Sequence, residues 1–239
     1  MTRKSLFLAT ALGASLFSTI VWAGPFNDFE TQVRAAYADY RGALFQTNKN
    51  DKPATEAALS ALTAKWAALA SKWSRQAPPQ YVDDPAFPQS LANVGTIINN
   101  ATTEATKGEL AKAHEVLEGI RDELGKLRER NGVIVFSDRM NAYHAKMEDV
   151  LGRDYSGFDA KGMGLLREDA AVLAYLYADI AAKPPTDANG KPDFAQALGA
   201  MKNTVDALVS ASRGSDAAAA KKAVDSLKGP YSMLFLKFG

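Results

Sequence analysis

Cysteine is absent from the 239-residue sequence. Its absence excludes disulfides, thiolate metal sites, a lipidated N-terminal cysteine and haem attachment through a CxxCH motif. Small extracellular domains of eukaryotes commonly depend on disulfides for their stability. If this chain is exported, a bacterial periplasm therefore suits it better than the outside of a eukaryotic cell.

Catalytic signatures are also lacking. The sequence contains no GxSxG nucleophile elbow, no glycine-rich phosphate loop and no HExxH zinc motif. Its 28 Lys and Arg residues nearly balance its 27 Asp and Glu residues, so no field of one sign would attract nucleic acid. We expect a protein that is not an enzyme and does not bind nucleic acid.

Long apolar runs are confined to the start of the chain. Arg3 and Lys4 precede an apolar segment at 5–21, and Ala23 ends a cleavage-like pattern of small residues. These features predict a cleavable signal peptide at 1–23 and export to the periplasm. The mature chain, 24–239, would carry 26 basic and 27 acidic residues. It has no stretch near the ~20 apolar residues of a membrane span; an uncleaved anchor is the alternative.

Strand-forming runs are nearly absent, apart from the valine and isoleucine residues at 133–135. Helix-forming residues dominate, alanine above all. Phe29, Val33, Tyr37 and Tyr40 recur at helical spacing and predict an amphipathic helix that reaches about residue 47. Similar stripes separated by glycine and proline continue along the chain. The sequence therefore predicts an all-α protein.

The helical pattern repeats at an offset of 107 residues. This offset aligns Pro78 with Pro185 and Phe87 with Phe194, together with several leucine stripes. We expect two tandem four-helix up-and-down bundles, 24–131 and 132–239, related by an internal duplication. One extended bundle of seven or eight similar helices is the alternative. The second unit would have helices at 136–152, 164–183, 193–212 and 216–238.

One of the two histidines lies in the first helix of the second unit. Met140, His144 and Met147 fall at positions i, i+4 and i+7 and so share one helical face. An imidazole and two thioethers suit a transition metal, copper first and iron second. Glu118 and Glu148 would serve as auxiliary ligands.

Core packing is the competing interpretation of this cluster. The 107-residue offset pairs His144 with Tyr37 and Met147 with Tyr40. Bulky residues therefore fill the same positions in the first unit, and methionine is an ordinary filler of helical cores.

The second histidine, His114, lies one helical turn before Glu118. Its counterpart at the 107-residue offset is Lys221, which favours a solvent-facing position. In a hairpin that turns at 131–135, His114 lies 17 residues before the turn and His144 nine residues after it. These separations correspond to about 26 and 14 Å along the two helices. We therefore expect the histidines not to share a site, with Glu118 and Arg121 nearer the level of His144.

The helix that contains His114 reads Ala-His-Glu-Val-Leu-Glu-Gly-Ile-Arg at 113–121. With its signal peptide and four-helix units, the chain resembles the periplasmic four-helix bundles of the cytochrome c-prime class. The resemblance implies a bundle fold. Those proteins attach haem through CxxCH on the last helix, a motif that this chain lacks, so covalent haem is excluded.

We expect a soluble periplasmic binding protein that holds copper or iron through the His/Met cluster. Two other functions stay open. One is a non-catalytic interaction or scaffold protein of the bacterial envelope, which would engage an envelope protein or a redox partner. The other is a non-covalent haem binder or the binder of another small ligand.

Overall fold

The computed structural model describes residues 24–239, and the predicted signal peptide at 1–23 lies outside this range. The described chain is helical throughout and contains no strand, which confirms the all-α class. The strand-like residues at 133–135 form an extended link between two helices. The helices are α1 (Pro25–Asn48), α2 (Lys52–Trp73), α3 (Phe87–Lys107), α4 (Leu110–Glu129), α5 (Phe136–Gly152), α6 (Ala160–Ala182), α7 (Pro192–Ser212), α8 (Ala217–Asp225) and α9 (Lys228–Phe238), with 3-10 turns η1 (Pro79–Tyr81) and η2 (Ser156–Phe158).

The first four helices pack into one bundle, in which α1 contacts α2 and α4 while α3 contacts α2 and α4. Their buried stripes meet in an apolar core. At one end, Phe29 packs edge-on against Trp73 and Tyr81, and Tyr81 stacks on Phe87 at 5.1 Å. The proline-rich link between α2 and α3 therefore closes the end of this bundle through the buried side chain of Tyr81.

Short polar residues and glycine set several helix ends. Asp51 accepts a hydrogen bond from the amide of Ala54 and so caps the start of α2, and Asp216 caps α8 through two amides. Gly108 ends α3 with a φ of 89°. This left-handed conformation favours glycine because it has no Cβ. These local signals explain why α2 and α8 begin, and α3 ends, at these residues.

The remaining helices form a second group, in which α6 contacts α5 and α7, and α7 contacts α8 and α9. The predicted single helix at 216–238 is wrong, because α8 ends at Asp225 and α9 begins at Lys228. Pro230 explains the interruption. A proline ring inside a helix clashes with the carbonyl four residues earlier, which here belongs to Ser226.

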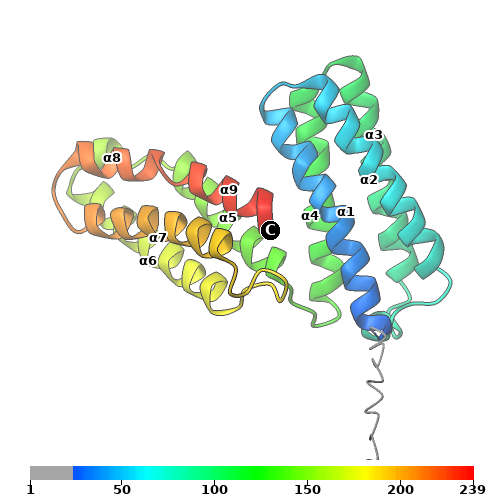
Figure 1. The fold of residues 1–239 in the computed structure, drawn as a ribbon. Helices are drawn as coiled ribbons and strands as arrows, with labels where there is room; N and C mark the ends of the chain where they lie inside the picture. The colour runs from blue at the N-terminus through cyan, green and yellow to red at the C-terminus, as the bar shows by residue number, and fades with distance from the viewer. Residues whose placement is uncertain (1–23) are drawn as a thin grey trace, which may run out of the picture.

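The two groups of helices are splayed apart and meet where α5 and α9 approach α1 and α4 (Figure 1). Arg41 on α1 donates from Nε to the carbonyl oxygen of Leu236 at 3.2 Å, and from a terminal nitrogen to that of Gly239. The ring of Tyr37 packs edge-on against Phe235. The end of α9 is thus fastened to the middle of α1.

A buried ion pair reinforces the turn between α4 and α5. Arg128 donates to Asp138 at 2.9 Å, and the other carboxylate oxygen of Asp138 accepts from the amide of Val135. Asp138 therefore caps the start of α5, as its place in the sequence suggests, while its charge offsets that of Arg128. Within residues 24–239, no helix is long and apolar enough to cross a membrane.

Candidate functional site: a pocket between the two bundles

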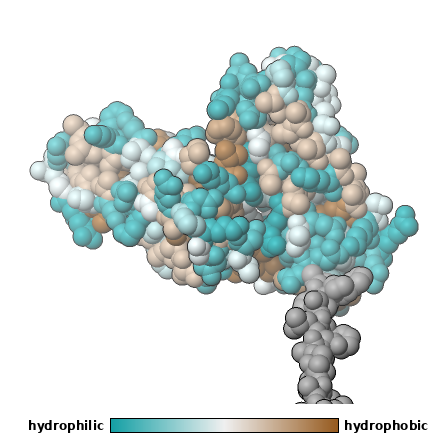
Figure 2. Space-filling view, viewed as in Figure 1, coloured by the Kyte–Doolittle hydropathy of each residue, from teal (hydrophilic) through white to brown (hydrophobic). Residues whose placement is uncertain are grey.

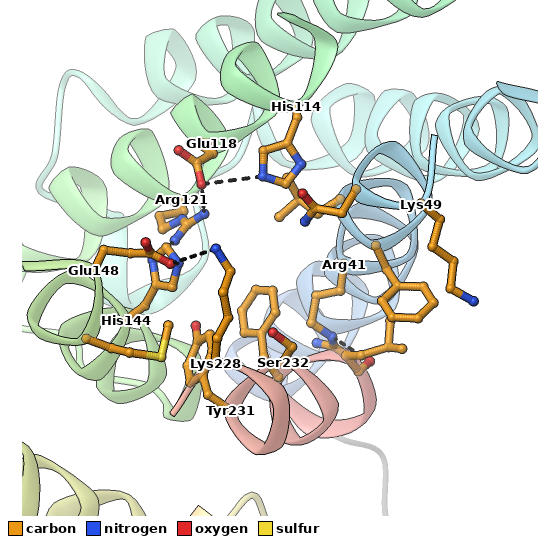
Figure 3. A pocket seen from close by; sticks show the side chains of 16 residues that line it. Arg41, Lys49, His114, Glu118, Arg121, His144, Glu148, Lys228, Tyr231 and Ser232 are labelled. Carbon is orange, nitrogen blue, oxygen red and sulfur yellow. Dashed lines mark hydrogen bonds and ion pairs between the residues drawn. The ribbon is translucent and has the colours of Figure 1, made fainter. Parts of the chain in front are cut away.

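A cavity of about 540 Å³ opens where the two groups of helices meet, lined by residues of α1, α4, α5 and α9. Its volume lies in the range of small-ligand sites. Figure 2 shows a notch between the two lobes of the molecule, with apolar side chains on part of its wall. In Figure 3 the polar side chains gather around an open centre. The apolar part of the lining comes from Leu44, Phe45, Met147, Phe235 and Leu236.

His114 projects from α4 into this pocket (Figure 3). The Thr47 hydroxyl donates its proton to the carbonyl oxygen of Leu44 at 2.8 Å and lies 2.7 Å from Nδ1 of His114. If the hydroxyl proton stays on this carbonyl, Nδ1 of the ring is the donor to Thr47. In that tautomer Nε2 of His114 carries a lone pair, and it lies 3.7 Å from Oε1 of Glu118.

Burial lowers the pKa of His114. The ring is thus neutral near pH 7, and its Nε2 lone pair is available to a ligand. In the tautomer with the proton on Nδ1, no proton lies between this nitrogen and the Glu118 carboxylate. Two electron-rich atoms that face each other in this way would both be stabilised by a cation placed between them.

His144 projects from α5 toward the same region. A guanidinium nitrogen of Arg121 donates to Nδ1 of His144, so the ring carries its proton on Nε2. Nε2 lies 3.4 Å from Oε1 of Glu148, and the ring stacks on Tyr231 at 5.3 Å between centroids. Burial, followed by the charge of Arg121, lowers the pKa of His144 to about 4. His144 is therefore also neutral at pH 7.

Each glutamate of the pocket is paired with a cation. Glu118 accepts from Arg121 at 2.9 Å, and Glu148 lies 3.1 Å from the Nζ of Lys228, which reaches over from α9 (Figure 3). These two negative and two positive charges cancel. Since both histidines are neutral, this part of the pocket carries no net charge.

The predicted ligands are divided between the pocket and the core. His144, Glu118, Glu148 and Met147 line the pocket, whereas Met140 does not. Both methionines are fully buried. In residues 24–239, no three His, Asp or Glu side chains are already arranged as a metal site. The structure thus brings the histidines together with the glutamates rather than with both methionines.

The expectation that the two histidines would lie apart was wrong in one respect. His114 and His144 line the same pocket. The two histidines do lie at different positions along the helix axes, since Arg121 and not His114 contacts His144. The pocket nevertheless includes both rings, because it extends over the eight residues from His114 to Arg121, about two turns of α4.

Three cations of the pocket, Arg41, Lys49 and Lys228, escaped the sequence reasoning, whereas Arg121 was expected near the level of His144. Arg121 follows Glu118 by three residues, a spacing that indicates a shared helical face. Arg41 and Lys228 gave no such signal. They reach the pocket only because α9 packs on α1 and α5, helices far apart in the chain.

A second cavity of about 1000 Å³ adjoins the first and lies between α4 and α5. Four residues line both cavities, namely Glu118, Arg121, His144 and Glu148. Arg121 therefore borders both spaces.

Comparison with known proteins gives no significant match to a family model, a curated protein or a solved structure.

Proposed function

We propose that this chain is a non-enzymatic binding protein that takes up a divalent transition metal ion, copper first and iron second, in the pocket between its bundles. The observation that carries the proposal is a convergence of donors. The carboxylate of Glu118 and the Nδ1 lone pair of His144 both contact the Arg121 guanidinium, and Nε2 of His114 lies 3.7 Å from the same carboxylate.

The donor types favour this class of metal. Imidazole nitrogen suits copper, iron, zinc and nickel, and carboxylate oxygen supports the harder of these ions. Glu148 lies close enough to His144 to complete the set or to orient the ring from its Nε2 side. Because the pocket offers mainly nitrogen and oxygen donors, the divalent state of copper fits it better than the reduced ion. Met147 adds a thioether to the wall.

Titration of the untagged mature protein with Cu²⁺ and Fe²⁺ tests the proposal, with bound metal counted after desalting. We expect one ion per chain, and His144→Ala and Glu118→Gln should each reduce the binding at least tenfold. Glu115→Gln is the matched control, because Glu115 lies on the same helix but is exposed. Absence of bound metal in the wild-type protein would contradict the proposal. A Soret band after incubation with haem would favour the haem alternative.

A small organic anion is the second candidate ligand. The pocket lining includes four cationic side chains, Arg41, Lys49, Arg121 and Lys228, against two carboxylates. The formal excess is therefore two positive charges, next to an apolar wall. Such a lining suits an amphipathic carboxylate. Protection of the protein against thermal unfolding by carboxylates, with no effect of metals, would favour this candidate.

We also infer that the chain acts in a bacterial periplasm. The support is the basic start, the apolar run at 5–21 and the small residues before Gly24. The absence of cysteine is compatible with this location. Fractionation of cells that express the full chain tests the inference, with N-terminal sequencing of the periplasmic protein expected to begin at Gly24.

We further infer that the two bundles arose by internal duplication. The support comes from the helix boundaries. Displaced by 107 residues, α2 would cover 159–180 and α3 would cover 194–214, close to α6 and α7. α4 would begin at 217, where α8 begins. Buried residues pair likewise, as Leu59 does with Leu166.

A further inference from the structure

Arg121 lies at the centre of the proposed metal site. Its side chain is only 12 % exposed. One terminal nitrogen of the guanidinium donates to Nδ1 of His144 and the other donates to Oε1 of Glu118. A single planar group thus bridges Glu118 on α4 and His144 on α5. His114 lies on the other side of Glu118, with its Nε2 3.7 Å from Oε1.

The lone pairs that Arg121 engages are those that a metal ion would need. A nitrogen lone pair that accepts a hydrogen bond is not free to coordinate a metal, and a guanidinium keeps its charge throughout the physiological pH range. A metal ion and the Arg121 guanidinium therefore exclude each other from the space between Glu118 and His144.

Charge leads to the same conclusion. Glu118 and Glu148 are balanced by Arg121 and Lys228. A divalent ion added to this arrangement would leave two uncompensated positive charges in a partly buried site. Repulsion between like charges a few ångströms apart in a partly buried site opposes such binding. Binding thus requires that a cation of the protein move away.

We propose that Arg121 is an internal cation that holds the metal position and is displaced by the incoming ion, so that this residue sets the affinity of the site. This inference rests on the metal-binding function proposed above. The second cavity gives the guanidinium a place to go, since Arg121 already lines it together with Asp122 and Glu129.

The same exchange would favour multivalent ions. A monovalent ion that replaces the guanidinium gains no charge over it and loses the guanidinium's two directed hydrogen bonds. A divalent ion brings one additional charge to the two glutamates. Lys228 is the second cation of the exchange, but its side chain is 57 % exposed. Its departure should therefore matter less than that of Arg121.

The test compares the affinity for Cu²⁺ of the wild-type protein and of Arg121→Gln by calorimetry at pH 7 in a weakly coordinating buffer. Glutamine removes the charge but can still donate a hydrogen bond to His144. We expect Arg121→Gln to bind Cu²⁺ at least tenfold more tightly. Lys228→Gln should tighten binding by a smaller factor. Arg34→Gln is the control for net charge, because Arg34 is exposed and does not line the pocket, and it should leave the affinity unchanged.

The outcomes separate this inference from the function on which it rests. If the wild-type protein binds Cu²⁺ and Arg121→Gln binds it equally or more weakly, the role of Arg121 is wrong while the metal site stands. If none of the variants binds a metal, the metal-binding function itself is wrong. Circular dichroism establishes that each variant is folded. Should Arg121→Gln fail to fold, an unchanged or weakened affinity of Lys228→Gln would overturn the exchange of cations.

Discussion

Arg121 donates a hydrogen bond to Nδ1 of His144 and thereby joins α4 of the first bundle to α5 of the second. The same guanidinium holds Glu118, which faces Nε2 of His114. The two histidines of the chain are thus connected through one carboxylate and one arginine. This connection lies at the pocket that α1, α4, α5 and α9 line together.

The first prediction concerns Arg41, which fastens α9 to α1 through two carbonyl oxygens. Arg41→Met keeps much of the apolar contact but leaves the carbonyls of Leu236 and Gly239 without this donor. Hydrogen bonds of charged groups contribute about 1.5–3 kcal/mol each, so we expect a loss of about 2 kcal/mol in the free energy of unfolding. Urea denaturation measures it. The matched control is Arg34→Met on the exposed face of α1, with a change below about 0.5 kcal/mol.

The second prediction concerns pH. His144 has a pKa of about 4 in the folded protein because of burial and the charge of Arg121, against about 6.5 in the unfolded chain. Between these values the unfolded chain binds a proton that the folded protein does not. Stability is therefore full above pH 6.5, falls as the pH decreases toward 4, and loses no more through this group below pH 4.

This shift corresponds to at most about 3 kcal/mol. Thermal denaturation of the protein in the presence of a chelator, between pH 4 and 8, measures the effect. In His144→Gln the fall between pH 6.5 and 4 should be largely removed, whereas His114→Gln should keep most of it. Equal pH profiles for the wild-type protein and His144→Gln would show that His144 does not titrate as described.

The third prediction concerns the ion pair at the turn between the bundles. Arg128 is buried, with 4 % of its surface exposed, and Asp138 is its partner. Asp138→Asn removes the carboxylate that pairs directly with the guanidinium, leaves only the more remote Glu30 to offset its charge, and should destabilise the protein by about 3 kcal/mol. In the double variant Arg128→Met/Asp138→Asn, the buried charge is absent as well. Its stability should lie above that of Asp138→Asn, and an additive loss in the double variant would argue against a coupled pair.

Much of the fold could be predicted from the sequence, because helix stripes and caps are local signals. The spacing of Phe29, Val33 and Tyr37 indicates the buried face of α1, and all three are buried. The all-α class followed from such stripes. The interruption between α8 and α9 could also be predicted, since Pro230 is incompatible with one continuous helix. A single helix was predicted instead, because the apolar stripe continues on both sides of the proline.

The site was predictable only in part. His144, Glu118 and Glu148 were proposed as ligands from their types and spacing, and all three line the pocket. His114 was not expected beside His144, because in a simple hairpin of α4 and α5 the two residues lie at different distances from the turn. The pocket is long enough along α4 to include both. Lys228 could not be foreseen, because its position depends on how α9 packs against helices that lie far away in sequence.

The most direct test of the metal site is the electron paramagnetic resonance spectrum of Cu²⁺ bound to the untagged mature protein. The chain contains only two histidines, so nitrogen couplings from imidazole can be assigned by substitution. We expect coupling from imidazole nitrogen in the wild-type protein, lost or reduced in His144→Gln and retained in Arg121→Gln with tighter binding. A spectrum without imidazole nitrogen coupling, or one that His144→Gln leaves unchanged, would contradict a copper site at His144.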